Sequence, residues 1–386
     1  MWLTLLRSSL FLLMLLTTAL GAGCQPGTPP PDTIVIGTLY TLNPQQPEAQ
    51  AVAIQGGRFR FVGSQEEALK LADSNTAVIY LDNAVAYPGL IDSHVHVAGI
   101  GSALRSVDLR SAQDFSELIE RVRARAGALR PGTVILGTGW HQSKWAQPPE
   151  GHLNGFPTHE ALSRAVPSHP VLLEHANGHS VLLNQAAMDS LDITGDSIAP
   201  EGGVIVRLNG KPTGLLHETA IKLTAPLQQY DLKTATSLVD AAQWHLLSQG
   251  ITTAHDAGAS QVDLAAQTRM AQEGSLIVRL YSMVYASDEG ALEEWLARGP
   301  LLNDGNHRLA VRSIKVQADG ALGSRTAWLH APYSDAPDTR GVLTFSLAAL
   351  SELIAKTRDD KWQINVHAIG DRANSEVLSV FAPFTK

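Results

Sequence analysis

The chain has 386 residues, of which 44% are apolar and 17% are charged, and its formal net charge at pH 7 is −8. This composition suits one large globular domain or two smaller domains with a sizeable core. The negative charge and the lack of a basic cluster exclude nucleic acid as the expected partner and favour a small molecule.

Residues 1–23 predict a signal peptide. Arg7 supplies a positive start, and the apolar run over residues 10–16 is too short for a permanent membrane helix. Small residues then precede Cys24, the single cysteine, at the place where a bacterial lipoprotein carries its lipid. The alternative is an ordinary cleaved signal with an incidental thiol. On either reading we expect export to the bacterial periplasm or cell envelope, with membrane contact only through a lipid on Cys24.

A proline-rich linker over residues 24–32 leads into a region of short strands. Gly56-Gly57 is typical of a hairpin turn between two of them. Residues 33–87 therefore predict a small β-sandwich domain without a catalytic role. The strands expected in it cover residues 34–36, 51–54, 59–62 and 78–81.

Two histidines end the apolar run Pro88-Gly-Leu-Ile-Asp-Ser-His-Val-His96. Side chains alternate between faces in an extended chain, so His94 and His96 point the same way and can bind one metal ion. The spacing alone also fits a pair of histidines on an ordinary strand face.

The chain beyond His96 alternates between strand and helix patterns, which implies a parallel sheet with helices outside. The number of repeats suits a barrel better than an open sheet. Residues 88–386 thus predict an α/β barrel, with an insertion over residues 151–222 that shapes the substrate pocket. The expected strands cover residues 134–136, 171–174, 251–255, 277–280, 311–315 and 363–367, and the expected helices cover 115–126, 236–248, 262–272 and 347–357.

Polar side chains lie at the ends of several of these strands, where barrels carry their function. Lys315 and His367 do so in addition to the first pair of histidines. Judged alone, Lys315 is better explained as a hydrogen-bonded polar residue, because a cationic lysine is a poor metal ligand. We expect His255 and Asp256 to be structural.

Several segments resemble one group of hydrolases. The run from Pro88 to His96 resembles the first-strand signature of the amidohydrolase superfamily, whose members hold one or two metal ions at the mouth of a (β/α)8 barrel. Five segments, in the family's order, resemble the family 3 branch that includes the N-substituted formamide deformylases. These segments cover residues 175–184, 214–218, 250–258, 314–327 and 366–373.

The resemblance implies a (β/α)8 TIM-type barrel and a metal-dependent hydrolase that cleaves a non-peptide carbon–nitrogen bond of a small amide-type molecule. His94 and His96 would hold one divalent ion, His367 would help to hold a second, and Lys315 would bridge them as a carbamate. Zinc suits such imidazole and oxygen ligands. The implied substrate-pocket residues are His179, Asn184, Glu218, Asp319 and Arg325. His179 and Asn184 could instead tie down the insertion, and Glu218 could pair locally.

The family pattern continues beyond Lys386 with a further histidine and a metal-binding aspartate, so we expect a barrel that is incomplete at its C-terminus. Two other functions stay open. The chain could be a catalytically impaired, truncated lipoprotein that serves as a binding scaffold. It could also be a metal-dependent phosphoesterase, although Arg325 and Arg372 are the only candidate cations near the site.

Overall fold

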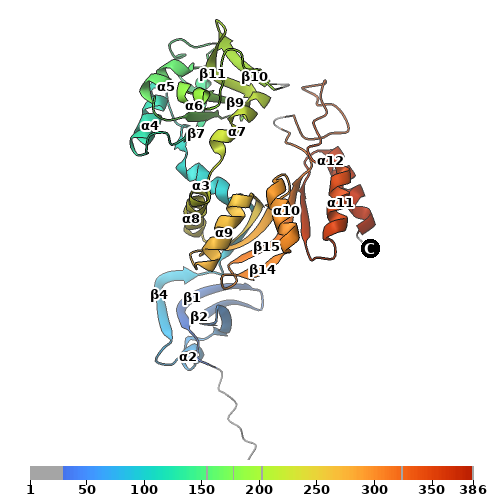
Figure 1. The fold of residues 1–386 in the computed structure, drawn as a ribbon. Coiled ribbons are helices and arrows are strands. Elements are labelled where there is room, and N and C mark those ends of the chain that lie inside the picture. Colours follow the sequence, from blue (N-terminus) through green and yellow to red (C-terminus); the bar gives the residue numbers. More distant parts are fainter. Residues whose placement is uncertain (1–28, 154, 177, 201–202, 323–324, 385–386) are drawn as a thin grey trace, which may run out of the picture. The chain divides into compact units, whose positions relative to one another are not determined.

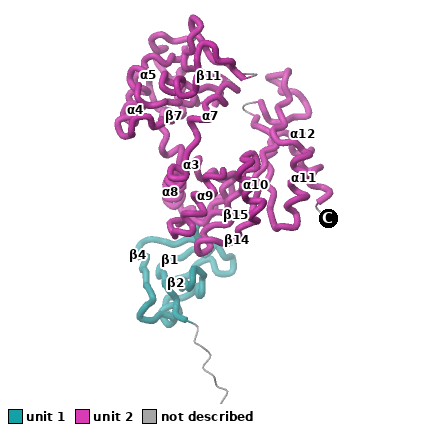
Figure 2. Tube along the Cα trace, in the orientation of Figure 1, with its two compact units in different colours: residues 1–89 teal, residues 90–386 magenta. Residues whose placement is uncertain are grey.

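The computed structural model describes residues 29–384, except 154, 177, 201–202 and 323–324. The expected signal peptide and Cys24 lie outside the described residues. Among the residues that are described, no helix is both long enough and apolar enough to cross a membrane. The chain divides into two compact units, residues 1–89 and residues 90–386 (Figure 2).

The smaller unit is built on one four-stranded sheet with the order β3-β2-β1-β4. In β1 the buried Ile34 and Ile36 alternate with partly exposed residues, whereas Ala51, Val52 and Ala53 of β2 are all buried. The apolar cluster of both strands includes Ala68 of the short helix α2. The described residues of this unit form one layer of sheet, so the second layer of the expected sandwich is not seen in them. The elements are β1 (Thr33–Asn43), β2 (Gln46–Gln55), β3 (Arg58–Gly63), α2 (Gln65–Leu69) and β4 (Ala77–Ala86).

The larger unit contains two sheets, of which the first is termed here the parallel sheet. Its five parallel strands are β5 (Leu90–Val95), β12 (Ile251–Ala259), β13 (Arg279–Tyr285), β15 (Leu309–Gln317) and β16 (Gln363–His367), and β14 (Leu301–Asp304) pairs antiparallel with the start of β15. Figure 1 shows α9 and α10 on one face of this sheet. The helices that accompany it are α3 (Val97–Arg105), α8 (Leu232–Ser248), α9 (Gln261–Gln272), α10 (Glu289–Arg298), α11 (Leu347–Thr357) and α12 (Asp371–Phe381).

The parallel sheet has the strand–helix alternation expected of a barrel, but it does not close within the described residues. There β5 pairs only with β12, and β16 pairs only with β15. Apolar residues of the strands and of the covering helices form one large core. The architecture seen is therefore a run of five parallel strands rather than a complete eight-stranded ring.

Helix α3 follows β5 directly and packs closely on α8 because of one glycine. A Cβ atom at Gly101 would lie 2.2 Å from the carbonyl oxygen of Leu238 on α8, so no larger residue fits there without displacing the helix. This contact fixes the element that begins immediately after His96.

The second sheet, termed the mixed sheet, has the order β10-β11-β9-β8-β7-β6. It corrects one expectation, because strands predicted over 134–136 and 171–174 as barrel repeats belong to this sheet as β7 and β8. The reason is pairing: β8 pairs parallel with β7 and antiparallel with β9. The strands are β6 (Val107–Asp108), β7 (Ile135–Trp140), β8 (Val171–His175), β9 (Ser180–Leu183), β10 (Gly203–Leu208) and β11 (Lys211–Glu218).

The departure from the barrel repeat accordingly begins soon after α3, well before residue 151 where the insertion was expected. Two apolar clusters form the core of the mixed sheet and its helices. The helices of this region are α4 (Phe115–Gly127), α5 (His159–Ala165), α6 (Gln185–Ser190) and α7 (Ala225–Gln228), and 3-10 turns cover η1 (Gln142–Lys144) and η2 (Thr219–Thr224), with η3 (Ala382–Phe384) after α12.

Candidate metal centre

A cavity of about 560 Å³ brings together three of the predicted site residues, and its lining includes His94 of β5, Lys315 of β15 and His367 of β16. The strands run parallel, so side chains near their carboxyl ends meet at one edge of the sheet although they are far apart in the sequence. Another cavity, of about 590 Å³, is lined by parts of α3, α4 and α8 and contains none of the predicted site residues.

His94 and His96 lie side by side at the end of β5. Their ring centroids are 5.8 Å apart and the rings are nearly perpendicular. Partial burial lowers the pKa of His96, and the neighbouring His94 and Lys315 lower it further because a second positive charge there is repelled. The imidazole of His96 is therefore favoured in its neutral form, which is the form that binds a metal.

Lys315 faces the same cavity and is only 8% exposed. Burial lowers the pKa of its amine, because the cationic form loses hydration that the neutral form needs less. Lys315 thus borders the same cavity as His94 and His367, which a bridging role requires.

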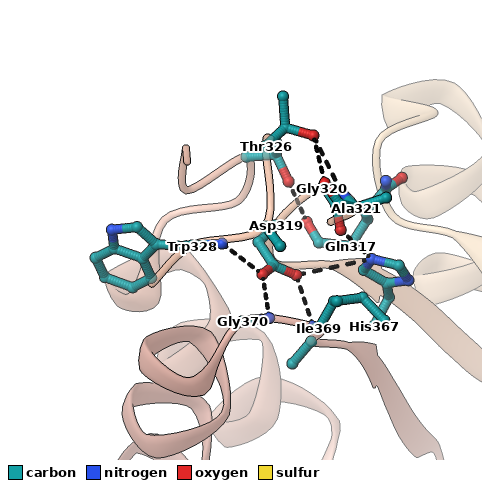
Figure 3. Close-up of polar contacts among 12 residues, drawn as sticks. Gln317, Asp319, Gly320, Ala321, Thr326, Trp328, His367, Ile369 and Gly370 are labelled. Atoms are coloured by element: carbon teal, nitrogen blue, oxygen red, sulfur yellow. Dashed lines mark hydrogen bonds and ion pairs between the residues drawn. The ribbon is translucent and has the colours of Figure 1, made fainter. Parts of the chain in front are cut away.

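His367 is the last residue of β16, and its ring is oriented by the segment that follows β15. Its Nε2 atom lies 2.9 Å from the carbonyl oxygen of Gly320 and 3.7 Å from Oδ1 of Asp319 (Figure 3). A proton on Nε2 that is donated to this carbonyl leaves Nδ1 as the acceptor nitrogen of the ring. His367 can then offer Nδ1 to a metal ion.

The donors fit a divalent ion on the condition that Lys315 is converted to a carbamate. Among the described residues, no three His, Cys, Asp or Glu side chains lie close enough together to hold a metal ion. The cavity instead combines imidazoles with a lysine amine, which binds no metal while it is cationic. Conversion of Lys315 to a carbamate would add two anionic oxygens, and imidazoles with anionic oxygens are a donor set that zinc accepts.

The model of the amidohydrolase family matches residues 77–383 of the chain. The chain belongs to this family. It is 31% identical over 358 residues to the putative amidohydrolase YtcJ of Bacillus subtilis, a match that covers 89% of this chain and 64% of that protein. It is 30% identical over 232 residues to the N-substituted formamide deformylase of Arthrobacter pascens, covering 58% of this chain and 42% of the deformylase.

A solved structure supports the same assignment of this amidohydrolase. An uncharacterized metal-dependent hydrolase from Pyrococcus horikoshii superposes with a TM-score of 0.75 at 26% identity, over 91% of this chain and 68% of that one. The chain therefore spans about two thirds of the length of these longer relatives.

Asn184, one of the predicted pocket residues of the amidohydrolase, is fully buried and bound to main chain. Its Oδ1 accepts the N–H groups of Val171 and Ala187, and its Nδ2 donates to the carbonyl oxygens of Val166 and His169, all at 2.8–2.9 Å. These contacts tie α5, β8 and α6 together. They match the structural alternative that the sequence left open for this residue.

The other pocket candidates are dispersed among the elements. His179 is half-buried just before β9, and Glu218 ends β11, where its side chain lies outside the described part of the chain. Arg325 forms an ion pair of 2.8 Å with Asp335. The described lining of the cavity that holds Lys315 includes none of these three residues.

Asp319 does not line the cavity either, although it adjoins the site. It is 0% exposed, and its carboxylate accepts the N–H groups of Trp328, Ile369 and Gly370 at 2.8–2.9 Å (Figure 3). Because this carboxylate is fully buried and binds main-chain donors, it is not exposed to a substrate in the cavity. The structure thus assigns it to the support of the His367 segment.

Asp256 is the strand-end carboxylate for which the sequence predicted a structural role, and the structure shows which main-chain group it binds. It is 2% exposed on β12, and its Oδ1 accepts the N–H of Val97, the residue after His96, at 3.2 Å. The sequence offered only the weak signal of a carboxylate beside a strand-end histidine. The contact joins Val97 and Asp256, which are 159 positions apart, and it depends on the pairing of β12 with β5.

Proposed function

We propose that this amidohydrolase is a metal-dependent hydrolase that cleaves a non-peptide carbon–nitrogen bond of a small amide-type molecule. The observation that carries the proposal is the cavity where His94, Lys315 and His367 meet. Family membership supports hydrolysis, and the relative named N-substituted formamide deformylase supports the carbon–nitrogen bond.

In this proposal His94 and His96 hold one divalent ion, His367 contributes to a second, and Lys315 lies between them. The neutral amine of Lys315 bonds through its nitrogen to the carbon of carbon dioxide and releases one proton, which leaves a carbamate anion. The lowered pKa of the buried amine favours the neutral, reactive form. Bound divalent ions would lower the pKa of a water molecule and polarise a carbonyl group. Zinc is the proposed metal.

The remainder of the cavity suits a small substrate with an apolar part. Apolar residues of β16, of α12 and of the segment between them form much of its wall, and the polar lining comprises Ser93, Asn365 and Asn374 in addition to His94, Lys315 and His367. A pocket of this kind binds an apolar body while a small number of polar groups orient the reacting bond. The apolar wall comprises Ile364, Val366, Ile369, Val377, Leu378 and Phe381.

A phosphoesterase is less well supported. A phosphate needs arginine or lysine donors at the site. Arg325 is engaged by Asp335, and the guanidinium of Arg372 lies 4.3 Å from the ring centroid of Trp328. Neither arginine belongs to the described lining of the cavity. Lys315 is thus the cation that the cavity offers, and carboxylation would reverse its charge.

Metal content of the 386-residue chain tests the proposal directly. Wild-type protein, loaded with zinc and bicarbonate and then desalted, should retain about one to two equivalents of zinc by elemental analysis. His94→Ala should lose most of it, whereas His245→Ala, an exposed histidine on α8, should not. Unchanged zinc in His94→Ala would contradict the site.

Activity distinguishes the enzyme from the scaffold. We expect the zinc-loaded chain to release amine and formate from a panel of N-substituted formamides, and His94→Ala to release neither. Retained zinc without turnover of any small amide in the panel would favour the alternative of a catalytically impaired binding scaffold.

A further inference from the structure

Each histidine-bearing strand of the site is followed within four residues by a helix whose N-cap residue contributes no side-chain hydrogen bond. Helix α3 begins after His96 and α12 begins after Gly370, and neither N-cap residue forms a side-chain hydrogen bond to the helix. The first N–H groups of a helix have no partner within it, so acceptors must come from elsewhere. His96 cannot be that acceptor if its imidazole is to bind a metal ion.

Asp256 supplies the acceptor for α3. It lies on β12, the neighbour of β5, and receives the N–H of Val97. Its other oxygen accepts from Nε2 of Gln267 at 2.7 Å, and Oε1 of Gln267 accepts from the hydroxyl of Ser282 at 2.6 Å. Gln267 and Ser282 are both fully buried. The orientation of the carboxylate is therefore fixed by a chain of hydrogen bonds through α9 and β13.

Asp319 acts just before α12, whose own N–H groups at Arg372 and Ala373 are accepted by Asp371 and by the carbonyl oxygen of Trp328. It follows β15, the neighbour of β16, and receives the N–H groups of Ile369 and Gly370, two and three residues after His367. The N–H of Trp328 completes its set of donors (Figure 3). Two buried carboxylates thus lie in similar places, Asp256 on the strand next to β5 and Asp319 just after the strand next to β16. Each accepts main-chain N–H groups within three residues after the histidine.

Neither carboxylate forms an ion pair with a lysine or arginine among the described residues. Of the side chains that the structure describes, the only basic partner within 4 Å of Asp319 is the imidazole of His367, at 3.7 Å. Burying an anion among neutral donors is costly, and an apolar residue of the same size could often fill such a place without loss of stability. What a carboxylate adds is a directional acceptor that sets where the neighbouring main chain runs.

We propose that Asp256 and Asp319 are positioning residues of the metal centre, which hold the strand ends that carry His96 and His367 by accepting main-chain N–H groups. The inference rests on the proposed function. Neither residue touches the metal or the substrate. Their role is to keep imidazoles from β5 and β16 at the spacing that metal binding needs, a task for which a displacement of about 1 Å matters.

Metal affinity in matched variants tests the proposal. Asp256→Asn and Asp319→Asn keep the side-chain shape but replace one acceptor oxygen with a donor. The control is Asp263→Asn, a buried carboxylate that caps α9 and accepts from Ser260 and Tyr230, after a strand to which no ligand is assigned. Cobalt binding is measured by chelator competition and by its visible absorption, and unfolding of the metal-free proteins is followed by circular dichroism.

We expect Asp256→Asn and Asp319→Asn to weaken cobalt binding about tenfold or more and to alter its visible bands, because supporting residues of metal ligands have effects of this size. Asp263→Asn should change affinity by less than about twofold even if it lowers the melting temperature equally. Equal effects of all three variants, or none, would overturn the proposal while leaving metal binding itself intact. Absence of cobalt binding in the wild type would instead overturn the proposed function, and this inference with it.

Ser282→Ala provides a milder variant in case either substitution prevents folding. It removes the last hydroxyl of the chain that orients Asp256 and leaves the carboxylate in place. We expect weaker cobalt binding by about two- to fivefold, below the effect of losing the carboxylate. An affinity equal to that of the wild type would contradict the part of the proposal that concerns Asp256.

Discussion

Gly258 of β12 lies against the side chain of Lys315. A Cβ atom at Gly258 would be 3.6 Å from Cγ of Lys315 and 3.3 Å from Cδ2 of Tyr285, and the backbone there has a φ of +133°. Both the close approach and the backbone conformation therefore favour glycine at this position. Gly258, which has no side chain, leaves room for the aliphatic part of the Lys315 side chain.

We expect Gly258→Ala to destabilise the protein by about 1–2 kcal/mol more than Gly274→Ala in urea unfolding. Gly274 also has a positive φ, of +74°, but a Cβ atom added there would meet no atom within 4 Å, so the comparison measures the tight approach to Tyr285 together with the rarer backbone conformation. Equal losses of stability would show that neither of these constrains position 258.

Bicarbonate should raise the zinc content of the wild type if Lys315 becomes a carbamate. Loading at saturating bicarbonate, compared with loading under carbon-dioxide-free buffer, should increase retained zinc, and a carbamate carbon should appear in the 13C spectrum of protein loaded with 13C-bicarbonate. Lys315→Met should abolish both effects, since methionine has no amine. A bicarbonate effect that persists in Lys315→Met would assign it to another group.

The stability of the protein should depend on the ionisation of Asp256. Burial is the main cause that raises the pKa of its carboxyl to about 6, from an ordinary value of 3.8, and the nearby Asp263 adds to it. The folded state thus keeps a proton that the unfolded state has lost between these values. The stabilisation by this proton is complete below pH 3.8 and is lost as the pH rises through about 6.

The measurement is the free energy of unfolding from about pH 3.5 to about pH 8, taken as the difference between wild type and Asp256→Asn. The wild type should lose stability relative to the variant over roughly pH 4 to 6 and run parallel to it at higher pH. The difference removes the contribution of carboxyls whose pKa is lowered, such as that of Glu117, which accepts the N–H of Gln113 and whose effect has the opposite sign. If the difference in the free energy of unfolding between the two proteins does not change with pH, the pKa of Asp256 is at its ordinary value.

Asn184→Ala should destabilise the chain by about 2–4 kcal/mol, because it leaves two N–H groups and two carbonyl groups of the mixed sheet and its helices without their partner. Urea unfolding gives the loss. If Asn184 is structural, the KM for any substrate found should be unchanged in the folded variant. A large rise in KM with little loss of stability would return Asn184 to the substrate pocket.

Lipid labelling of the wild type and of Cys24→Ala tests the expectation that Cys24 carries a lipid anchor. In a bacterial host fed labelled palmitate, the wild-type chain should carry the label and sediment with membranes, whereas Cys24→Ala should carry none, because the acylated thiol is gone. Export of the unlabelled wild type into the soluble periplasm would support an ordinary cleaved signal instead.

Local patterns in the sequence were sufficient for many of the elements. The helix predicted over residues 347–357 is α11 with the same limits, and the strand predicted over 363–367 is β16. For α11 the start is marked by Ser346, whose side chain caps the helix by accepting the N–H of Ala349. The strand expected at 277–280 proved to be β13 at 279–285, because the apolar run extends through Met283 and Val284. Helices α10 and α12 were not predicted.

The sequence by itself determined that Lys315 and His367 lie at or near the ends of parallel strands and to which family the chain is similar, whereas the shared face of His94 and His96 stays a prediction. These properties follow from side-chain alternation and from short motifs. Only the tertiary structure decided that β7 and β8 leave the parallel sheet, and that Asp256 and Asp319 serve the main chain beside the histidines. Such assignments depend on hydrogen bonds between strands distant in the sequence, and no local pattern encodes which strands will pair.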